Sequence, residues 1–198
     1  MRFGKLELSG GFLLLGALLY YLDQDGIVAA SLFFCFLHEL GHYVIIRMFG
    51  GDVRKISVTV IGAEMVLRGR MSYLGDMLSA LSGPAVNLVL ALLLCRNERW
   101  ILYAGVNLAL ALFNLLPLSC LDGGKFLAGL LSFCFGPQQA VATGEWIDRL
   151  LGGVLLFGGV FLLGSCGNFT LLLVSLWFLR KNGLGWKRSC QTRQKRVQ

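Results

Sequence analysis

The sequence has little charge for its length. Only 15% of its 198 residues are charged, and its mean hydropathy is +0.71. A soluble domain of this size needs more polar side chains to cover its surface, so a soluble globular protein is excluded. Intrinsic disorder is excluded as well, because disordered chains are poor in apolar residues and 56% of these residues are hydrophobic. The composition therefore predicts an integral membrane protein.

Paired cysteines and internal repeats are also missing from the sequence. Six cysteines are present, but none forms a C-x-x-C pair, and most lie in or beside apolar stretches. A disulfide framework and a thiolate zinc site are therefore not supported. No internal repeat or low-complexity segment is visible in the sequence.

The sequence is instead dominated by apolar stretches that could cross a membrane as helices, each of which needs about 20 mostly apolar residues. The stretches are 6–22, 27–48, 77–94, 100–118, 150–163 and 169–179, of which the last two are short. We predict an all-α polytopic membrane protein with about six transmembrane helices. Residues 1–180 would form a single membrane-embedded domain with its core at about 27–135, and 181–198 a basic cytoplasmic tail.

The basic residues are divided unevenly between the two sides of this arrangement. With six spans, all of them except Arg96 and Arg99 fall on the side that holds both termini. By the positive-inside rule that side is cytoplasmic, and we expect the membrane to be the bacterial cytoplasmic membrane. Residues 23–26, 95–99 and 164–168 would face outward. The net charge of +7 and the basic tail predict contact with anionic lipid, and no nucleic acid.

Two segments outside the apolar stretches have patterns of their own. Residues 56–61 alternate as a strand does, and 64–68 can return after a turn, which predicts a small β-hairpin between the second and third spans. An isolated hairpin is only marginally stable, so we expect it to lean on the membrane domain. Residues 137–149 have one apolar face, which predicts a short helix in the cytoplasmic interface with Trp146 at headgroup depth.

The second stretch contains a motif typical of metalloproteases, His38-Glu39-Leu40-Gly41-His42, which includes the only two histidines of the chain. Residues four apart share a helix face, so both imidazoles can bind one metal ion, and Glu39 can act as general base on a water molecule. Titratable groups inside an apolar span are costly and are usually functional. The alternative, histidines merely hydrogen-bonded in a bundle core with Glu39 paired to one of them, is the weaker interpretation.

Two histidines leave a zinc site short of its usual three protein ligands. Asp122 follows the fourth stretch, after Pro117 and before a glycine pair, so we expect it on an irregular or restarted segment at the cytoplasmic edge of the membrane. It could instead simply cap the next helix. The other candidate ligands on the same side are Glu64, Asp76, Asp52 and, more weakly, Cys120.

These motifs resemble those of the site-2 protease family of intramembrane zinc metallopeptidases. The family pairs H-E-x-x-H with N-x-x-P-x-x-x-x-D-G, matched here by Asn114, Pro117, Asp122 and Gly123, and often has a Ser-Gly-Pro-x-x-Asn run, matched by Ser82, Gly83, Pro84 and Asn87. The resemblance covers about residues 27–135. It is greatest to the sporulation protein IVFB branch, which usually has a CBS domain where this sequence has a basic tail.

The resemblance implies an intramembrane zinc metalloprotease with one Zn²⁺ per chain, held by His38, His42 and Asp122, with Glu39 as the catalytic base. Its substrate would be a membrane protein cut in a transmembrane or membrane-proximal segment, in regulated proteolysis of a membrane-tethered transcription factor or its regulator. A membrane regulatory partner is also expected. Asn114 could contact the oxyanion or the substrate, although helix–helix hydrogen bonding explains it equally well.

Helix–helix hydrogen bonding is the favoured interpretation of two further asparagines, Asn87 and Asn107. Two other functions compete with the protease. A catalytically inactive membrane-binding relative would not need Glu39. A metal transporter could use the same three ligands, but transporter folds often show paired half-repeats, and this sequence has none.

Overall fold

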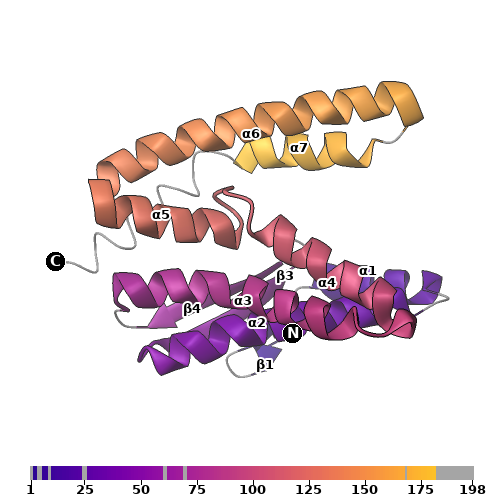
Figure 1. Ribbon diagram of the computed structural model, residues 1–198, viewed down its shortest axis with the longest axis horizontal. Helices are drawn as coiled ribbons and strands as arrows, with labels where there is room; N and C mark the ends of the chain where they lie inside the picture. Colours follow the sequence, from indigo (N-terminus) through magenta and orange to yellow (C-terminus); the bar gives the residue numbers. More distant parts are fainter. Residues whose placement is uncertain are drawn as a thin grey trace. The chain divides into compact units, whose positions relative to one another are not determined.

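The computed structural model describes residues 2–3, 6–8, 10–23, 26–59, 62–68, 71–167 and 169–181. The chain divides into two compact units, Met1–Asn114 and Leu115–Gln198, which are described in turn. In chain order the elements are β1 (Arg2–Phe3), β2 (Leu6–Leu8), α1 (Gly10–Leu22), α2 (Ile27–Met48), β3 (Asp52–Thr59), β4 (Gly62–Arg68), α3 (Tyr73–Leu94), the 3-10 turn η1 (Glu98–Trp100), α4 (Ile101–Asn114), α5 (Asp122–Phe135), α6 (Pro137–Cys166) and α7 (Thr170–Lys181) (Figure 1).

Three helices among the described residues, α2, α3 and α6, are long and apolar enough to cross a membrane. The other four helices have 12 to 14 residues. A helix of 14 residues is about 21 Å long, which is shorter than the roughly 30 Å of a hydrocarbon core. The structure is thus mostly helical with apolar spans, as predicted, whereas the count of six spans is not confirmed.

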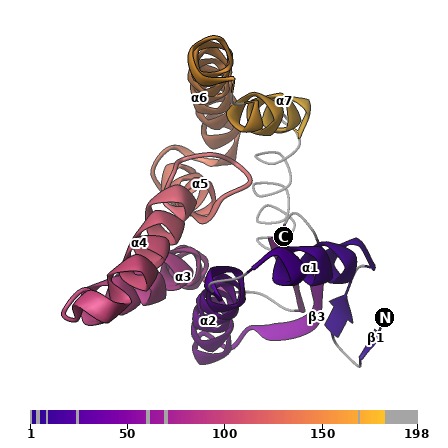
Figure 2. The same cartoon turned by 90° about the vertical axis from the view of Figure 1, so that its right-hand side faces the viewer.

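Helices α2 and α3 lie side by side in the first unit (Figures 1 and 2). The buried residues of α2 recur every fourth position and form a stripe of Phe34, His38, His42 and Ile46. A Cβ atom built on Gly41 would lie 3.1 Å from the carbonyl oxygen of Ser82, so the two backbones approach closely there. The stripe therefore directs both histidines of α2 toward α3.

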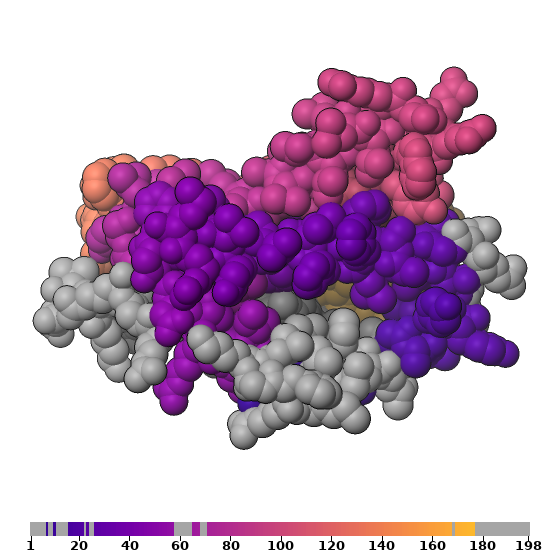
Figure 3. All heavy atoms as spheres, turned by 90° about the horizontal axis from the view of Figure 1, so that it is seen from below, coloured from indigo at the N-terminus to yellow at the C-terminus, as the bar shows by residue number. Residues whose placement is uncertain are grey.

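The opposite face of α2 is apolar and exposed. It contains Phe33, Phe36, Leu40 and Val44, and α2 lies on the surface seen in Figure 3. An exposed apolar face is what lipid contact requires, whereas water would disfavour it.

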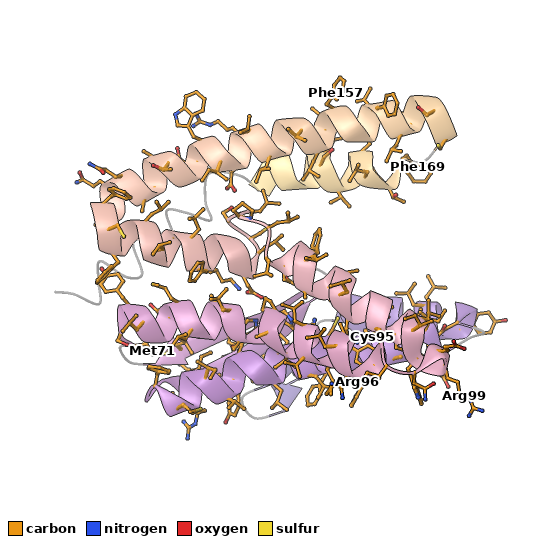
Figure 4. All side chains as sticks on the ribbon, viewed as in Figure 1. Met71, Cys95, Arg96, Arg99, Phe157 and Phe169 are labelled. Atoms are coloured by element: carbon orange, nitrogen blue, oxygen red, sulfur yellow. The ribbon has the colours of Figure 1, made fainter. Side chains whose placement is uncertain are left out.

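Helix α3 begins four residues before the predicted start of its span. The hydroxyl of Ser72 accepts a hydrogen bond from the N–H of Gly75 (3.0 Å), which caps the helix. Figure 4 shows Met71 at one end of the unit and Arg99 at the other. The loop between α3 and α4, with Cys95, Arg96 and Arg99, therefore lies at the far end of the unit from the start of α3.

The predicted hairpin is confirmed, and it belongs to a larger sheet with the strand order β1-β2-β3-β4. β3 and β4 pair antiparallel, with Ile56 opposite Met65, and β2 pairs with β3 in parallel. The prediction of one helix over 6–22 is therefore wrong at its start, because Leu6–Leu8 is a strand and α1 begins at Gly10. An ion pair between Lys55 and Glu7 (2.6 Å) joins β3 to β2.

The second unit contains α5, α6 and α7, and α7 lies against α6 (Figure 2). α6 is one continuous helix of 30 residues, so the prediction of a separate interfacial helix over 137–149 is wrong. Its buried face is a stripe of small residues and one carboxylate, namely Ala140, Gly144, Asp148 and Gly152. Trp146 is exposed, as are Phe157 on α6 and Phe169 before α7, both labelled in Figure 4.

Candidate metal centre

His38 and His42 face each other one turn apart on α2. Their Nε2 atoms are 3.1 Å apart, their ring centroids are 4.8 Å apart, and their planes are nearly perpendicular at 83°. Both side chains are buried, with 6% and 8% of their surfaces exposed. The i, i+4 spacing of the predicted motif thus brings two imidazole nitrogens to one point.

This arrangement fits zinc. Two nitrogen ligands at about 2.0–2.1 Å from a tetrahedral zinc ion lie roughly 3.3–3.4 Å apart, close to the 3.1 Å between these Nε2 atoms. Gly83 of α3 lies against the same point, since a Cβ atom built on it would come within 2.6 Å of His38 Nε2 and closer still to His42 Nε2. The space in front of both nitrogens exists because residue 83 has no side chain.

The outer nitrogen of His42 is held by α3. His42 Nδ1 lies 2.6 Å from the carbonyl oxygen of Ser79, and Ser82 Oγ donates to the same carbonyl at 2.7 Å. A carbonyl can only accept, so Nδ1 of His42 carries the proton and its Nε2 keeps a lone pair. Pro84, buried within α3, has no N–H to donate to the Ala80 carbonyl in the turn before it.

The outer nitrogen of His38 also contacts α3. Asn87 Nδ2 lies 3.2 Å from His38 Nδ1, and Asn87 is completely buried. The sequence favoured helix–helix hydrogen bonding for Asn87, and the structure shows that its helix partner is a candidate metal ligand. The signal was the Ser-Gly-Pro-x-x-Asn run, in which Gly83 and Asn87 share one face of α3 at a spacing of four.

Glu39 follows His38 on α2 and is partly buried. It is adjacent in sequence to one candidate ligand and three residues from the other, as a general base beside a metal requires.

Asp122 belongs to the second unit, where it is the first residue of α5 and is buried, with 4% of its surface exposed. α4 ends at Asn114, Pro117 lies in the irregular segment that follows, and the chain becomes helical again at Asp122. The predicted restart of the helix is therefore confirmed. Lys125 Nζ forms an ion pair with Asp122 Oδ1 at 2.8 Å, within the first turn of α5.

The glycine pair lets the segment before α5 fold back onto its first turn. A Cβ atom on Gly123 would collide with the carbonyl of Leu115, and one on Gly124 with the carbonyl of Leu118. The same segment is tied to α6, because Ser119 N–H donates to Asp148 Oδ1 at 3.0 Å. Asp148 is buried and anchors the segment that carries Asp122.

Three of the remaining candidates from the sequence, Asp52, Asp76 and Cys120, are less buried than His38, His42 and Asp122. Asp52 is half exposed and pairs with Arg47 at 3.2 Å. Asp76 lies in the first turn of α3, Cys120 is partly exposed, and the side chain of Glu64 lies outside the described residues. Asn114 Nδ2 donates to the carbonyl of Leu110 in its own helix at 3.0 Å.

Comparisons with known proteins agree with this chemistry. A zinc metalloprotease of Methanocaldococcus jannaschii, MJ0392, is 28% identical over 71% of this chain and 43% of its own length. A putative zinc metalloprotease of Synechocystis, sll0528, is 30% identical over 85% of this chain and 49% of its own. The putative zinc metalloprotease Rip3 of Mycobacterium tuberculosis is 32% identical over 58% of this chain and 33% of its own. No family model matches the sequence.

The fold has a solved counterpart. The structure of a site-2 protease from Methanocaldococcus jannaschii matches 96% of this chain and 93% of its own, with a TM-score of 0.65 and 23% identity. The chain has the fold of that protein, and its apolar spans agree with an integral membrane protein. It spans less than half the length of the curated relatives it matches.

Proposed function

We propose that this protein is an intramembrane zinc metalloprotease that cuts a membrane protein within or beside a transmembrane segment. The observation that carries the proposal is the buried histidine pair of α2, whose Nε2 atoms lie 3.1 Å apart with both outer nitrogens engaged by α3. The relatives named zinc metalloproteases support the same chemistry.

His38, His42 and Asp122 would hold one Zn²⁺ per chain. Each of the three side chains is buried within its own unit. Two neutral imidazoles and one carboxylate, with one position left open, are a usual donor set for catalytic zinc. When bound, zinc supplies the Lewis acidity that makes water nucleophilic at neutral pH and polarises the scissile carbonyl.

Glu39 would move the protons of the reaction. As general base it takes a proton from the attacking water, and as general acid it returns that proton to the amide nitrogen that leaves. Asn114 is proposed as a donor to the oxyanion or to the substrate backbone. In the structure its amide donates to Leu110 of the same helix, so this role requires that bond to be exchanged for one with the substrate.

A helical substrate has to unwind before its carbonyl can be attacked, and its freed backbone groups then need partners. We propose that the sheet supplies them by strand addition. In the strand order β1-β2-β3-β4, β3 is paired on both sides, whereas β4 (Gly62–Arg68) lies at an edge of the described sheet. We propose that the substrate pairs with this edge.

The cellular setting is part of the proposal. We propose both termini in the cytoplasm of a bacterium, the basic tail against anionic lipid, and a membrane-tethered transcription factor or its regulator as substrate, under the control of a membrane partner. Membership in the sporulation branch stays a prediction from the resemblance.

A cleavage assay with purified protein tests the proposed activity. The purified protein is incubated in detergent with each of two probes. The first is fluorescein-labelled casein, which is an unfolded general substrate. The second is a single-span fusion protein with a helix-breaking pair of residues in its span. We expect cleavage of the fusion near its span, loss of activity with a chelator, and recovery with one equivalent of Zn²⁺. Tight zinc binding without cleavage of either probe would favour the inactive relative, and zinc flux in liposomes would favour the transporter.

A further inference from the structure

We infer that Phe34, Tyr103 and Trp100 form an aromatic barrier that closes the histidine site toward η1, so that water reaches the site only from the end of the first unit at which α3 begins. The inference rests on the proposed function, because hydrolysis inside a membrane needs water at the metal, while a water path through the whole unit would make the membrane leak. The ring contacts, burial and polar side chains that support it all belong to the first unit.

The aromatic barrier lies one helical turn from the histidine pair. Phe34 precedes His38 by four residues in the buried stripe of α2, and only 9% of its surface is exposed. Its ring meets that of Tyr103 edge to face, with centroids 6.2 Å apart and planes at 67°. Tyr103 lies in the first turn of α4 and also contacts Trp100 of η1, at 5.6 Å between ring centroids. The three rings therefore connect the buried stripe of α2 to η1.

Small apolar residues of α3 and α4 complete the layer around Phe34. His38 contacts Asn87 of α3, and α2 and α3 run antiparallel. The residue four positions after Asn87 therefore comes level with the residue four positions before His38, which places Ala91 at the level of Phe34. Ala91 is 7% exposed, and Ala104, in the first turn of α4, is 5% exposed. A buried layer of one phenyl ring and two alanines offers water no hydrogen-bond partner among its side chains, and apolar constrictions of this kind dewet.

Polar side chains are concentrated on the other side of this layer. Between its start and Gly83, α3 has four polar side chains, none of them buried, namely Ser72, Asp76, Ser79 and Ser82. From residue 88 to its end at Leu94, the same helix is entirely apolar. The two completely buried asparagines, Asn87 and Asn107, also lie on the histidine side, each about one turn from the layer. The polar half of α3 thus suits a hydrated path, and the apolar half does not.

A barrier differs from ordinary core packing in what it controls. A core residue contributes to stability, whereas a barrier also decides from which side of the membrane a small solute reaches the level of the histidines. Phe36 is the matched control for Phe34, because it is the same residue type on the same helix but is 60% exposed on the opposite face. Only Phe34 should affect access.

The test labels a thiol at the level of the histidines from each side of the membrane. In the full-length protein without native cysteines, Ser82→Cys places one thiol there, because Ser82 Oγ lies 3.4 Å from His42 Nδ1. A second protein keeps only Cys95, which is exposed in the loop before η1 and marks the η1 side (Figure 4). Intact cells and inverted membrane vesicles are treated with an impermeant methanethiosulfonate reagent, so the readout needs neither bound zinc nor cleavage.

Ser82→Cys should react only from the side opposite to the one that labels Cys95. Adding Phe34→Ala should raise its rate of labelling from the η1 side at least about tenfold, whereas adding Phe36→Ala should leave that rate unchanged. If Phe34→Ala fails to fold, Tyr103→Ala opens the same layer from α4 and takes its place. Labelling of Ser82→Cys from the η1 side with Phe34 intact would overturn the proposal, as would labelling from neither side or equal rates for the two alanine variants. Absence of proteolysis would refute the proposed function and leave the labelling result as it is.

Discussion

Replacing Gly83 with alanine should strongly weaken metal binding by filling the space in front of the two histidines. The added Cβ would lie 2.6 Å from His38 Nε2 and closer still to His42 Nε2. A comfortable contact between such atoms is about 3.5 Å, so the methyl group is roughly 1 Å too close. Either α3 must move away from α2, or both imidazoles must turn away from the point at which they meet.

Either movement displaces the histidine nitrogens by more than a zinc site tolerates, since zinc–ligand distances vary by only about ±0.2 Å. We therefore expect zinc affinity to fall at least about 100-fold, which corresponds to roughly 2.7 kcal/mol. Gly105→Ala is the matched control, because Gly105 is also a helical glycine of the first unit and a Cβ there would meet nothing within 4 Å. Gly105→Ala should keep zinc and lose no stability, since alanine favours a helix over glycine by about 0.5–1 kcal/mol.

The assay is zinc titration of both purified variants against a chelating dye, with thermal unfolding in detergent to show that each is folded. Cobalt can replace zinc as a probe, since its visible absorption reports the number and geometry of its ligands. A Gly83→Ala protein that is folded and binds zinc as tightly as wild type would show that the metal does not lie between the two Nε2 atoms.

Three further predictions concern other parts of the chain. Asp148→Asn weakens a charge-assisted hydrogen bond from Ser119, so the free energy of unfolding should fall by about 1–3 kcal/mol, and zinc affinity should fall as well. If neither quantity changed, Asp148 would not anchor the segment that carries Asp122. Prolines at Met65 and Val66, neighbouring residues of β4 whose N–H groups point to opposite sides, should act differently. The proline that replaces the residue whose N–H points away from β3 should lower cleavage of the single-span fusion while zinc stays bound. Normal cleavage by both proline variants would exclude β4 as the edge to which the substrate adds. On a background without native cysteines, an impermeant reagent should label a cysteine at Arg96 from outside the cell and not one at Asn182, and the reverse result would invert the topology.

The second span was predictable to the residue, because its pattern is local. The apolar run 27–48 coincides with α2, and the spacing of its histidines fixes their meeting on one face. The start of α3 was predicted four residues late. Its N-cap, Ser72, stands before residues that are not uniformly apolar, so hydropathy alone did not include the first turn.

The N-terminal strands could not be predicted from a local pattern. Leu6–Leu8 continues directly into an apolar helix, and its identity as a strand depends on parallel pairing with β3, some fifty residues away, at Leu6–Ile56 and Leu8–Val58. Such a pairing leaves no periodicity in the short segment itself.

The second unit was predicted least well, and for a physical reason. Residues 137–149 were predicted to lie in the membrane interface, whereas the carboxylate of Asp148 within them is buried and accepts the N–H of Ser119. The small residues Ala140, Gly144 and Gly152 on the same face gave no hydrophobic signal, although they allow close packing. The segment that starts at Asp122 was predicted only as irregular or restarted, because its glycine pair is typical of a loop, and the length of α5 was not predicted.

The central claim is that Glu39 performs the chemistry on a zinc ion that the histidines and Asp122 hold. The most direct measurement is the zinc content and the cleavage rate of Glu39→Gln and Asp122→Asn, determined side by side on the same preparations as the wild type. Glu39→Gln should keep about one zinc per chain while cleavage falls by at least the roughly 10²- to 10⁴-fold that a general base contributes. Asp122→Asn should lose zinc affinity and cleavage together. Normal cleavage by Glu39→Gln would contradict the mechanism, and full zinc and activity in Asp122→Asn would contradict the ligand set.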